Sequence, residues 1–320
     1  MTFTPFKRLR RFAAAFCLAL ACAAGAQTNT PAQSPRACTP ERLRARMEEI
    51  AKETGGPVGA AAVIIEGGRA ASFNGSQRFP MQSVYKLPIG MAVLREVDRG
   101  RLSLAQKIDV RPEDLVPERL HSPLRDNNPR GATFTLRELI RLMISESDGT
   151  ASDVLLGLAG GPEKVSAYLR GLGVGGVVVA TTERAMAQGD DQVQYRNFAT
   201  PESMLTLLRA LQEGRGLSRA GRNLLLDFML KSTPGPRRLK GMLPAGTPVA
   251  HKTGTSSTTE GVTRATNDVG VVTLPDGRHM AVAVFVSDTK ADADVREGVI
   301  AKVARAAWDC WATNRRGRTR

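Results

Sequence analysis

A serine and a lysine, Ser83 and Lys86, stand three residues apart near the start of a predicted helix. The apolar residues that follow recur with helical spacing, which places both side chains on one helix face. A serine hydroxyl is a weak nucleophile until a neighbouring base takes its proton, and a buried lysine can be that base. The unpaired N–H groups of a helix start can also stabilise an oxyanion. The pair therefore indicates nucleophilic acyl transfer, with a capping serine beside a solvated lysine as the alternative interpretation.

Three further segments carry groups that suit acyl transfer. Ser147 begins a Ser-Asp-Gly sequence directly after a predicted helix. The run Lys-Thr-Gly-Thr at 252–255 lies in a predicted strand, where the lysine offers a cation for a carboxylate and the glycine lets a substrate backbone lie close. Glu183 lies in residues 181–200, which are polar and without periodicity, so a long functional loop is expected there. A loop carboxylate in a salt bridge is the other interpretation of Glu183.

The elements that must position these groups change from strands to helices and back to strands. We therefore expect an α/β (α+β) fold with an antiparallel sheet of about five strands, flanked by helices, and the active site between the sheet and an inserted, mostly helical domain. The expected boundaries are 27–80 and 232–320 for the sheet domain and 81–231 for the helical domain. The individual predictions are strands at 58–65, 69–73, 249–256, 268–274 and 280–287, and helices at 40–53, 134–143, 201–212, 218–231 and 292–311.

Residues 1–26 predict a secretory signal peptide. Four cations precede an apolar run at 12–24 that is too short to span a bilayer, and small residues at 24–26 offer a cleavage site. The mature protein is expected to begin at Gln27 and to be periplasmic or secreted. A lipidated form at Cys22 is the alternative. No later stretch is long and apolar enough to cross a membrane, so no membrane partner is expected after cleavage.

Composition and residue spacing exclude several classes of partner. The formal net charge is +14, but eight cations lie in the signal segment and the C-terminal tail. Export and the lack of a basic-aromatic motif argue against nucleic acid as a partner. His121, His251 and His279 lack metal-ligand spacing and have no cysteine partners nearby, so no metal site is expected. Cys38 and Cys310 remain after signal cleavage, and an oxidising compartment permits a bridge between them.

Taken together, these motifs resemble those of a known enzyme family. The Ser-x-x-Lys at Ser83, the Ser-Asp-Gly at Ser147 and the Lys-Thr-Gly at Lys252 are similar, in order and spacing, to the motif set of class A β-lactamases and penicillin-binding proteins. Glu183 favours the β-lactamase side. The resemblance runs from about residue 40 to 310. It implies the class A fold and a monomeric enzyme. The implied reaction is opening of the β-lactam ring of penicillins and cephalosporins, including oxyimino-cephalosporins, and it needs no cofactor. Longer stretches resemble the PER-type branch of class A, at 79–86, 190–195, 239–246 and 251–256.

The resemblance implies a role for each matching catalytic residue. Ser83 resembles the nucleophile that is acylated, and Lys86 the proton acceptor beside it. Glu183 resembles the base that activates the deacylating water, and whether lysine or glutamate is the acylation base is disputed for the family. Ser147 resembles the hydroxyl that passes a proton to the β-lactam nitrogen. Lys252 belongs to the same catalytic set.

Further residues match the substrate site of the family. The residues that resemble the holders of the substrate carboxylate are Lys252, Thr253, Gly254 and Thr255. The backbone N–H groups of Ser83 and Thr255 match the oxyanion hole. Arg238 matches an arginine that supports the carboxylate site, with an exposed cation as the alternative. His121 lies where relatives carry an aromatic residue at the site entrance. His251 points to the opposite strand face from Lys252, so we expect it to pack rather than to form a Ser-His-Asp triad.

Two positions depart from the family pattern. Gly149 stands where the family usually has an asparagine that bonds the lysine and the substrate, and losing one such hydrogen bond costs ~1 kcal/mol or more. Ala187 stands four residues after Glu183, where most class A enzymes have an asparagine that helps to hold the water. The cysteine pair of some carbapenemases is absent, with Gln82 and Ser256 in those places.

The resemblance also bears on the cysteines and on rival functions. In the class A architecture the first and last helices pack antiparallel, which implies a Cys38–Cys310 bridge, with two unpaired thiols as the alternative. A penicillin-binding D,D-peptidase and a β-lactam sensor that stays acylated are the two rival functions. Glu183 argues against both.

Overall fold

The structure is a computed structural model that describes residues 1–3, 38–190 and 192–312. The chain divides into two units, Met1–Arg36 and Ala37–Arg320, and the second contains every element named below. The predicted signal peptide beyond Phe3 and the arginine-rich tail lie outside the described residues. In the part of the chain that is described, no helix is long and apolar enough to cross a membrane.

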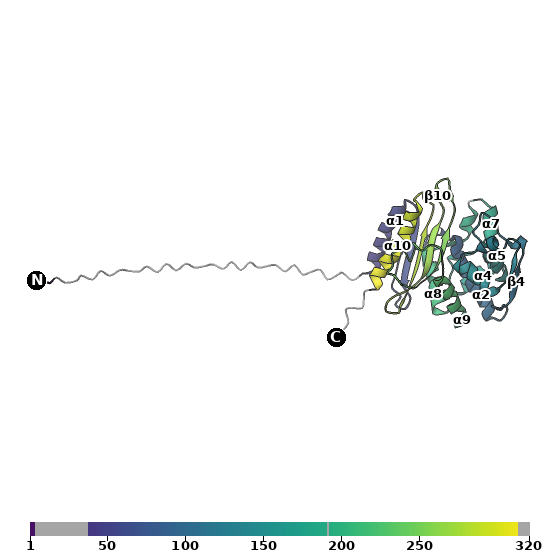
Figure 1. Ribbon diagram of the computed structural model, residues 1–320, viewed down its shortest axis with the longest axis horizontal. Helices are drawn as coiled ribbons and strands as arrows, with labels where there is room; N and C mark the ends of the chain where they lie inside the picture. The colour runs from purple at the N-terminus through teal and green to yellow at the C-terminus, as the bar shows by residue number, and fades with distance from the viewer. Residues whose placement is uncertain (4–37, 191, 313–320) are drawn as a thin grey trace. The chain divides into compact units, whose positions relative to one another are not determined.

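A five-stranded antiparallel sheet forms the frame of the second unit, in the order β2-β1-β12-β11-β8 (Figure 1). β1 pairs with β12, which joins the two ends of the sequence within one sheet. The predicted sheet is confirmed, and the strands begin and end within two residues of the expected positions. The strands are β1 (Val58–Ile64), β2 (Ala70–Phe73), β8 (Val249–Thr255), β11 (Thr266–Thr273) and β12 (His279–Val286).

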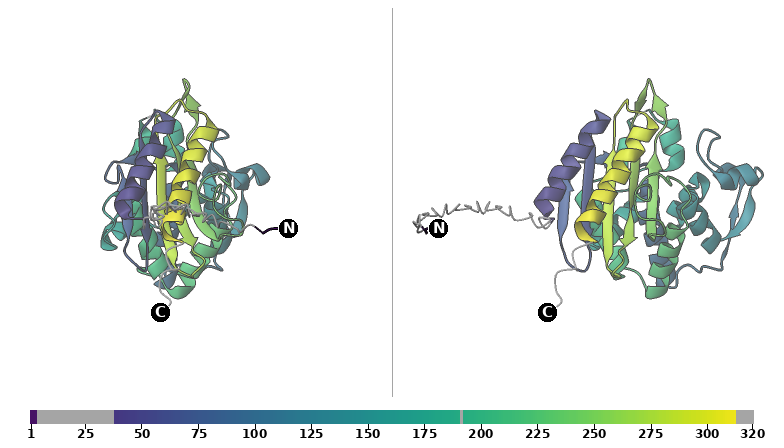
Figure 2. Two further views of the ribbon diagram at one scale, coloured as in Figure 1. Left: turned by 90° about the vertical axis from the view of Figure 1, so that its left-hand side faces the viewer. Right: turned by 60° about the vertical axis from the view of Figure 1, so that its left-hand side comes forward.

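Both faces of this sheet are buried, because successive side chains point into two different cores. In β1, Ala60 belongs to the core beneath α1 (Pro40–Ala51) and α10 (Ala293–Trp311), whereas Ala61 belongs to the core beneath the other helices. α1 and α10 lie side by side on one face (Figure 2). The sheet therefore separates this two-helix layer from the helices of the middle of the sequence.

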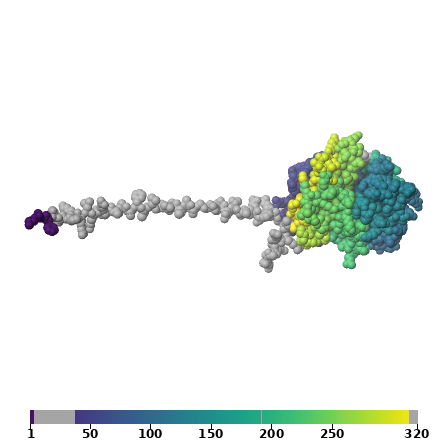
Figure 3. All heavy atoms as spheres, viewed as in Figure 1, coloured from purple at the N-terminus to yellow at the C-terminus, as the bar shows by residue number. Residues whose placement is uncertain are grey.

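Helices from the middle of the sequence cover the other face (Figure 1). In the space-filling view, residues near 100–150, coloured blue-green, lie at the opposite end from the yellow α10 (Figure 3). The helices are α2 (Lys86–Asp98), α3 (Pro123–Asn127), α4 (Leu136–Ser145), α5 (Gly149–Leu158), α6 (Pro162–Gly171), α7 (Glu183–Gln188), α8 (Pro201–Glu213) and α9 (Arg219–Leu230). The short strand pairs are β4 (Lys107–Val110) with β5 (Ala132–Thr135), β3 (Phe79–Pro80) and β6 (Val177–Val178) with β7 (Phe198–Ala199), and β9 (Thr258–Thr259) with β10 (Val262–Thr263).

Most helices begin where the sequence carries a capping signal. Thr135 accepts a hydrogen bond from the N–H of Glu138, whose carboxylate bonds back to Thr135, so a capping box begins α4. Ser218 and Asp292 cap α9 and α10 through their side chains. The segment 181–200 differs from the prediction, because it contains α7 and a 3-10 turn as well as loop. α7 has six residues, which is too short to show a periodic pattern.

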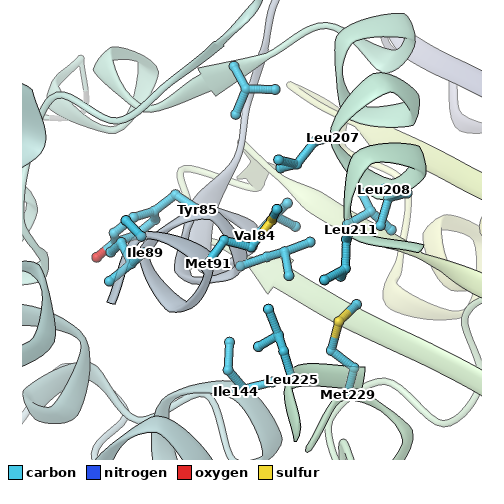
Figure 4. Close-up of a cluster of buried hydrophobic side chains, with 14 of the residues drawn as sticks. Val84, Tyr85, Ile89, Met91, Ile144, Leu207, Leu208, Leu211, Leu225 and Met229 are labelled. Atoms are coloured by element: carbon cyan, nitrogen blue, oxygen red, sulfur yellow. The ribbon is translucent and has the colours of Figure 1, made fainter. Parts of the chain in front are cut away.

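The residues beside Ser83 are anchored in the larger core (Figure 4). Val84 and Tyr85 are fully buried and share this cluster with Met91 of α2 and Leu208 of α8. Ser83 is only partly buried and lines a cavity. Full burial of a large apolar side chain is worth roughly 1.5–3 kcal/mol. The two residues that follow Ser83 therefore hold the segment in place while the serine stays accessible.

Candidate active site

Ser83 lies in a 3-10 turn (Gln82–Tyr85) that runs directly into α2. Gln82 has a φ of 47°, a left-handed conformation that is strained for a residue with a side chain. The turn places the Lys86 Nζ 3.0 Å from the Ser83 Oγ. The structure thus brings the predicted pair together, with Ser83 in the turn and Lys86 as the first residue of the α-helix.

Lys86 is almost fully buried, with 1% of its surface exposed. Besides the Ser83 hydroxyl, its Nζ bonds the carbonyl oxygen of Ser147 at 2.7 Å. The same nitrogen lies 2.8 Å from the Glu183 Oε1. A buried ammonium group needs such partners, because an unpaired buried charge is strongly destabilising. A single nitrogen therefore joins three of the predicted catalytic residues.

Glu183 is the first residue of α7, and the start of this helix is held from two sides. The Thr182 hydroxyl oxygen accepts a hydrogen bond from the N–H of Ala185. Asp153 of α5 accepts hydrogen bonds from the N–H groups of Glu183 at 2.8 Å and Arg184 at 3.0 Å. The prediction that Glu183 lies in a long functional loop at 181–200 is therefore wrong in one respect: Glu183 begins a short helix, whose cap is completed by a carboxylate from another helix.

Asp153 and Tyr85 are two residues of the site that the sequence analysis missed. Burial raises the pKa of Asp153 to about 6, and its bonds to the two N–H groups of α7 act in the opposite direction. Burial, together with the charges of Glu183 and Asp153, raises the pKa of Tyr85 well above its ordinary value, so its hydroxyl keeps its proton. One sequence signal points to Asp153: it lies one helical turn after Gly149 and hence near Ser147.

Ser147 connects the two lysines of the site. Its carbonyl oxygen bonds Lys86, and its hydroxyl oxygen accepts a hydrogen bond from the Lys252 Nζ at 2.8 Å. Ser147 has a φ of 62°, so its backbone is held in the left-handed region to make both contacts. Lys252 is fully buried on β8, and burial, followed by the charge of Lys86, lowers the pKa of Lys252 well below its ordinary value.

β8 passes directly against the nucleophile segment at Gly254. A Cβ atom on Gly254 would lie 2.3 Å from the carbonyl oxygen of Met81 and 3.2 Å from the backbone nitrogen of Ser83. The protein's own backbone therefore requires this glycine, apart from any approach of a substrate. The next residue, Thr255, lines the same cavity as Ser83 and has an exposed side chain.

Arg238 is buried, with 6% of its surface exposed, so the alternative of an exposed cation is wrong. Its Nη1 donates to the carbonyl oxygens of Gly254 at 3.2 Å and Asn267 at 3.0 Å. Its Nη2 donates to the Thr255 Oγ1 at 2.8 Å, and its Nε pairs with Glu297 of α10 at 3.1 Å. Arg238 does not line the cavity and reaches it through the Thr255 hydroxyl.

His121 and Gly149 meet at one wall of the site. His121 is exposed and lines the cavity, and its Nε2 lies 2.9 Å from the carbonyl oxygen of Glu146. The N–H of Gly149 donates to the carbonyl oxygen of His121 at 3.0 Å. A Cβ atom on Gly149 would lie 3.1 Å from that oxygen and 3.4 Å from a methyl carbon of Val116. The wall is therefore closely packed around glycine.

These residues surround an open cavity of about 990 Å³. This volume is at the upper end of the range of roughly 300–1,000 Å³ for small-molecule sites. Lys252 and Arg238 lie behind its wall and contact it through Ser147 and Thr255. The predicted site residues that line the cavity are Ser83, Lys86, His121, Ser147, Glu183, Thr253, Gly254 and Thr255.

Two other predicted features lie apart from the cavity. Cys38 and Cys310 form a disulfide with Cα atoms 5.1 Å apart, beside α1 and α10. His251 is fully buried, and its Nδ1 lies 2.9 Å from both carboxylate oxygens of Asp268. His251 thus has the packing position expected for it, away from Ser83.

Comparisons with known proteins agree with this geometry. The profile of the Beta-lactamase enzyme family matches residues 42–311. The chain is 37% identical to Beta-lactamase VEB-1 of Pseudomonas aeruginosa over 271 residues, which is 84% of this chain and 90% of that protein. It is also 37% identical to Extended-spectrum beta-lactamase PER-1 of the same species over 279 residues, 87% of this chain and 88% of that protein.

Solved structures show the same relationship. A β-lactamase from Chitinophaga pinensis matches with a TM-score of 0.81 and 46% identity, over 83% of this chain and 98% of that chain. The TLA-3 extended-spectrum β-lactamase matches with a TM-score of 0.82 and 38% identity, over 85% of this chain and 99% of that chain. Both the family profile and these relatives cover most of the sequence. The chain therefore belongs to the β-lactamase enzyme family, as a class A β-lactamase of the PER type.

Proposed function

We propose that this enzyme opens the β-lactam ring through an acyl-enzyme on Ser83. The observation that carries the proposal is the position of the Lys86 nitrogen, 3.0 Å from the Ser83 Oγ and 2.8 Å from the Glu183 Oε1. If Lys86 passes a proton to Glu183, its neutral amine can accept the proton of the Ser83 hydroxyl. The Ser83 oxygen then attacks the β-lactam carbonyl carbon, and the N–H groups of Ser83 and Thr255 stabilise the oxyanion.

Opening of the ring requires a proton on the leaving nitrogen. The Ser147 oxygen already accepts a hydrogen bond from Lys252, which leaves the proton of its hydroxyl for the β-lactam nitrogen. Lys252 also provides positive charge for the substrate carboxylate, beside the hydroxyls of Thr253 and Thr255. That carboxylate favours the ammonium form of Lys252 against the effect of burial. Substrate binding and the action of Ser147 are therefore coupled through one lysine.

Before deacylation, Lys86 gives the proton taken from Ser83 to the Ser147 oxygen and regains its own proton from Glu183, so Glu183 is again a carboxylate. Deacylation then uses Glu183 as a general base that activates water for attack on the ester at Ser83. Asp153 supports this step by holding the first turn of α7, on which Glu183 stands. Ala187 lines the cavity where the family usually has an asparagine that contacts the water. The water therefore has one side-chain partner fewer, and its position depends more heavily on Glu183.

We infer a substrate range of penicillins and cephalosporins that includes oxyimino-cephalosporins. Two relatives with 37% and 38% identity are named as extended-spectrum enzymes, PER-1 and TLA-3. The cavity of about 990 Å³ has room for a large acyl side chain. We also infer an exported monomer, periplasmic or secreted, because residues 1–26 have the pattern of a signal peptide and the Cys38–Cys310 bridge suits an oxidising compartment.

The test is intact-mass spectrometry of a Glu183→Gln variant mixed with a cephalosporin. We expect a persistent adduct on the variant and rapid clearance by the parent enzyme. Loss of the proton transfer from Lys86 should slow acylation, but loss of water activation should slow deacylation more, so the adduct accumulates. Glu49→Gln, which removes an exposed carboxylate on α1, is the matched control and should clear the adduct like the parent. Equal clearance by parent and Glu183→Gln would assign deacylation to another group. A parent enzyme that keeps its adduct would indicate a penicillin-binding peptidase or a β-lactam sensor instead.

A further inference from the structure

A second cavity, of about 680 Å³, lies at the ends of α2 and α5 that are far from the catalytic residues. α2 begins at Lys86, and its last turns, from Ala92 to Arg99, form one wall. α5 begins at Gly149, and its C-terminal end at Leu158 forms another. Residues of α6 and Gly216 close the remaining sides. The cavity is therefore separate from the Ser83 site but contacts two of the helices that position it.

Four cations line this second cavity, and two of them make no ion pair with a described residue. Arg99 and Arg101 both pair with Glu96, the single carboxylate in the lining. Arg95 and Lys164 form no ion pair or hydrogen bond through their side chains with any residue that the structure describes. Arg95 is also partly buried, so it is not simply a solvated surface arginine. Arg95 interacts electrostatically with Glu96 without forming an ion pair, so three arginines share this one carboxylate.

The helix dipoles account for Arg95 but not for Lys164. Arg95 stands in the last turn of α2, where the dipole favours a cation. Lys164 stands in the first turn of α6, where the dipole disfavours one. The N-cap of α6 is Gly161, which offers no side-chain acceptor to the first N–H groups of that helix. Lys164 and the N–H groups of the α6 terminus therefore add positive charge to the lining, whereas Glu163 of the same turn is not part of it. Asp98 of α2 is bonded to Ser218.

The floor of the cavity combines apolar surface with one hydroxyl. Ala92, Leu158 and Leu172 supply apolar contacts. The Tyr168 hydroxyl makes a long hydrogen bond of 3.4 Å to the carbonyl oxygen of Gly216. Burial raises the pKa of Tyr168 to about 12, so the hydroxyl remains a donor at neutral pH. The cavity thus offers two unpaired cations and a hydroxyl donor beside an apolar floor.

We propose that this cavity is a binding site for an amphiphilic phosphoryl anion, with the phosphoryl group at Arg95, Lys164 and Tyr168 and its apolar substituent over Ala92, Leu158 and Leu172. A guanidinium group from α2 and an ammonium group from α6 can together bind more than one oxygen of a tetrahedral dianion. The same chemistry occurs in a soluble phosphate monoester and in the headgroup of an anionic lipid. Occupancy would connect α2 with α6 through the ligand.

The test uses the full mature enzyme in a buffer without phosphate, with phenyl phosphate as the probe and isothermal titration calorimetry as the readout. We expect saturable binding, weaker binding of benzoate and of inorganic phosphate, and at least about tenfold weaker binding of phenyl phosphate by Arg95→Gln and by Lys164→Gln. Arg305→Gln, which removes an exposed arginine of α10, is the matched control and should bind like the parent. Thermal unfolding of each variant without the probe establishes that it is folded.

A second arm identifies the source of the phosphoryl group. Vesicles of phosphatidylcholine with and without phosphatidic acid are sedimented with the parent and with Arg95→Gln. Sedimentation that needs phosphatidic acid and Arg95 assigns the site to a lipid headgroup, whereas binding of phenyl phosphate alone assigns it to a soluble monoester. The proposal is overturned if neither probe binds at millimolar concentration, or if Arg95→Gln and Lys164→Gln bind as tightly as the parent.

Discussion

The two faces of the central sheet carry different kinds of core. On the α1–α10 side lie a buried apolar cluster and the paired His251 and Asp268, and the Cys38–Cys310 disulfide links the chain just before α1 to α10. On the other side, Lys86, Glu183 and Lys252 are buried beside the larger apolar cluster. Apolar burial and a cross-link stabilise a fold, whereas buried charges destabilise it unless they are well paired. The residues that stabilise the fold and the residues proposed for catalysis are therefore largely separated by one sheet.

Ser83→Ala should have the largest effect on the catalytic side and almost none on stability. In the proposed mechanism Ser83 is the nucleophile, and its removal abolishes the covalent pathway, so we expect kcat to fall by at least about 10⁴-fold. The serine is partly exposed and its neighbours Val84 and Tyr85 hold the segment, so the unfolding midpoint should stay close to that of the parent. Steady-state hydrolysis of a chromogenic cephalosporin measures kcat, and urea unfolding of the same samples measures the midpoint. A folded variant with more than a trace of turnover would show that Ser83 is not the nucleophile.

The double variant Cys38→Ser with Cys310→Ser should lose much of its stability and keep almost all of its catalytic activity. The bridge joins residues 272 positions apart, and loop-closure entropy gives roughly 5 kcal/mol for so long a loop, although measured values are often smaller. We expect a large loss of unfolding free energy in urea, with kcat of the folded variant within about twofold of the parent because distant sites act independently.

Thiol titration of the unfolded, unreduced mature protein is the control for this variant. Two free thiols in the parent would show that the bridge does not form in solution. A large fall in kcat of the folded double variant would show that the two sides of the sheet are not independent.

Asp153→Asn should change the dependence of stability on pH. The pKa of Asp153 is raised from 3.8 to about 6, so the folded state binds more protons than the unfolded state between these values. The stabilising contribution of this group is therefore fully present below about pH 4 and is lost as the pH rises through 6, by up to about 3 kcal/mol. Asparagine has no such titration.

The measurement compares urea unfolding of parent and Asp153→Asn at several pH values from 4 to 7. The variant loses hydrogen bonds to the first turn of α7, so we expect it to be less stable than the parent at low pH. The difference should shrink as the pH rises, because only the parent then buries a charge. A difference that does not depend on pH would show that Asp153 has an ordinary pKa in the folded enzyme.

Local patterns in the sequence are enough to predict the strands and the motif residues. The sheet follows from apolar runs such as 58–65, and Ser83, Lys86 and Lys252 follow from short spacings that recur in the family. Contacts between distant segments could not be predicted in this way. The burial of Arg238 depends on acceptors 16 to 29 positions away, and the cap of α7 depends on Asp153 30 positions before Glu183. Such partners become neighbours only through the fold.

The smallest predicted effect concerns Gly149, where two contributions oppose each other. Restoring the family's asparagine adds an amide that can bond a substrate side chain, worth ~1 kcal/mol. Its Cβ atom, however, would lie 3.1 Å from the carbonyl oxygen of His121, which must move by a few tenths of an ångström. Because His121 lines the cavity, that movement disturbs the entrance of the site. The net change in kcat/KM for Gly149→Asn should therefore stay below about tenfold.

Gly149→Ala separates the two contributions, because alanine adds the Cβ atom without the amide. We expect Gly149→Ala to lower kcat/KM for all substrates, and Gly149→Asn to exceed Gly149→Ala by about fivefold for substrates with an amide side chain. For a substrate without that amide the two variants should be equal. If asparagine is no better than alanine with either substrate, the wall formed by Val116 and His121 keeps the new amide away from the substrate, and this side of the sheet tolerates only the glycine around which it is packed.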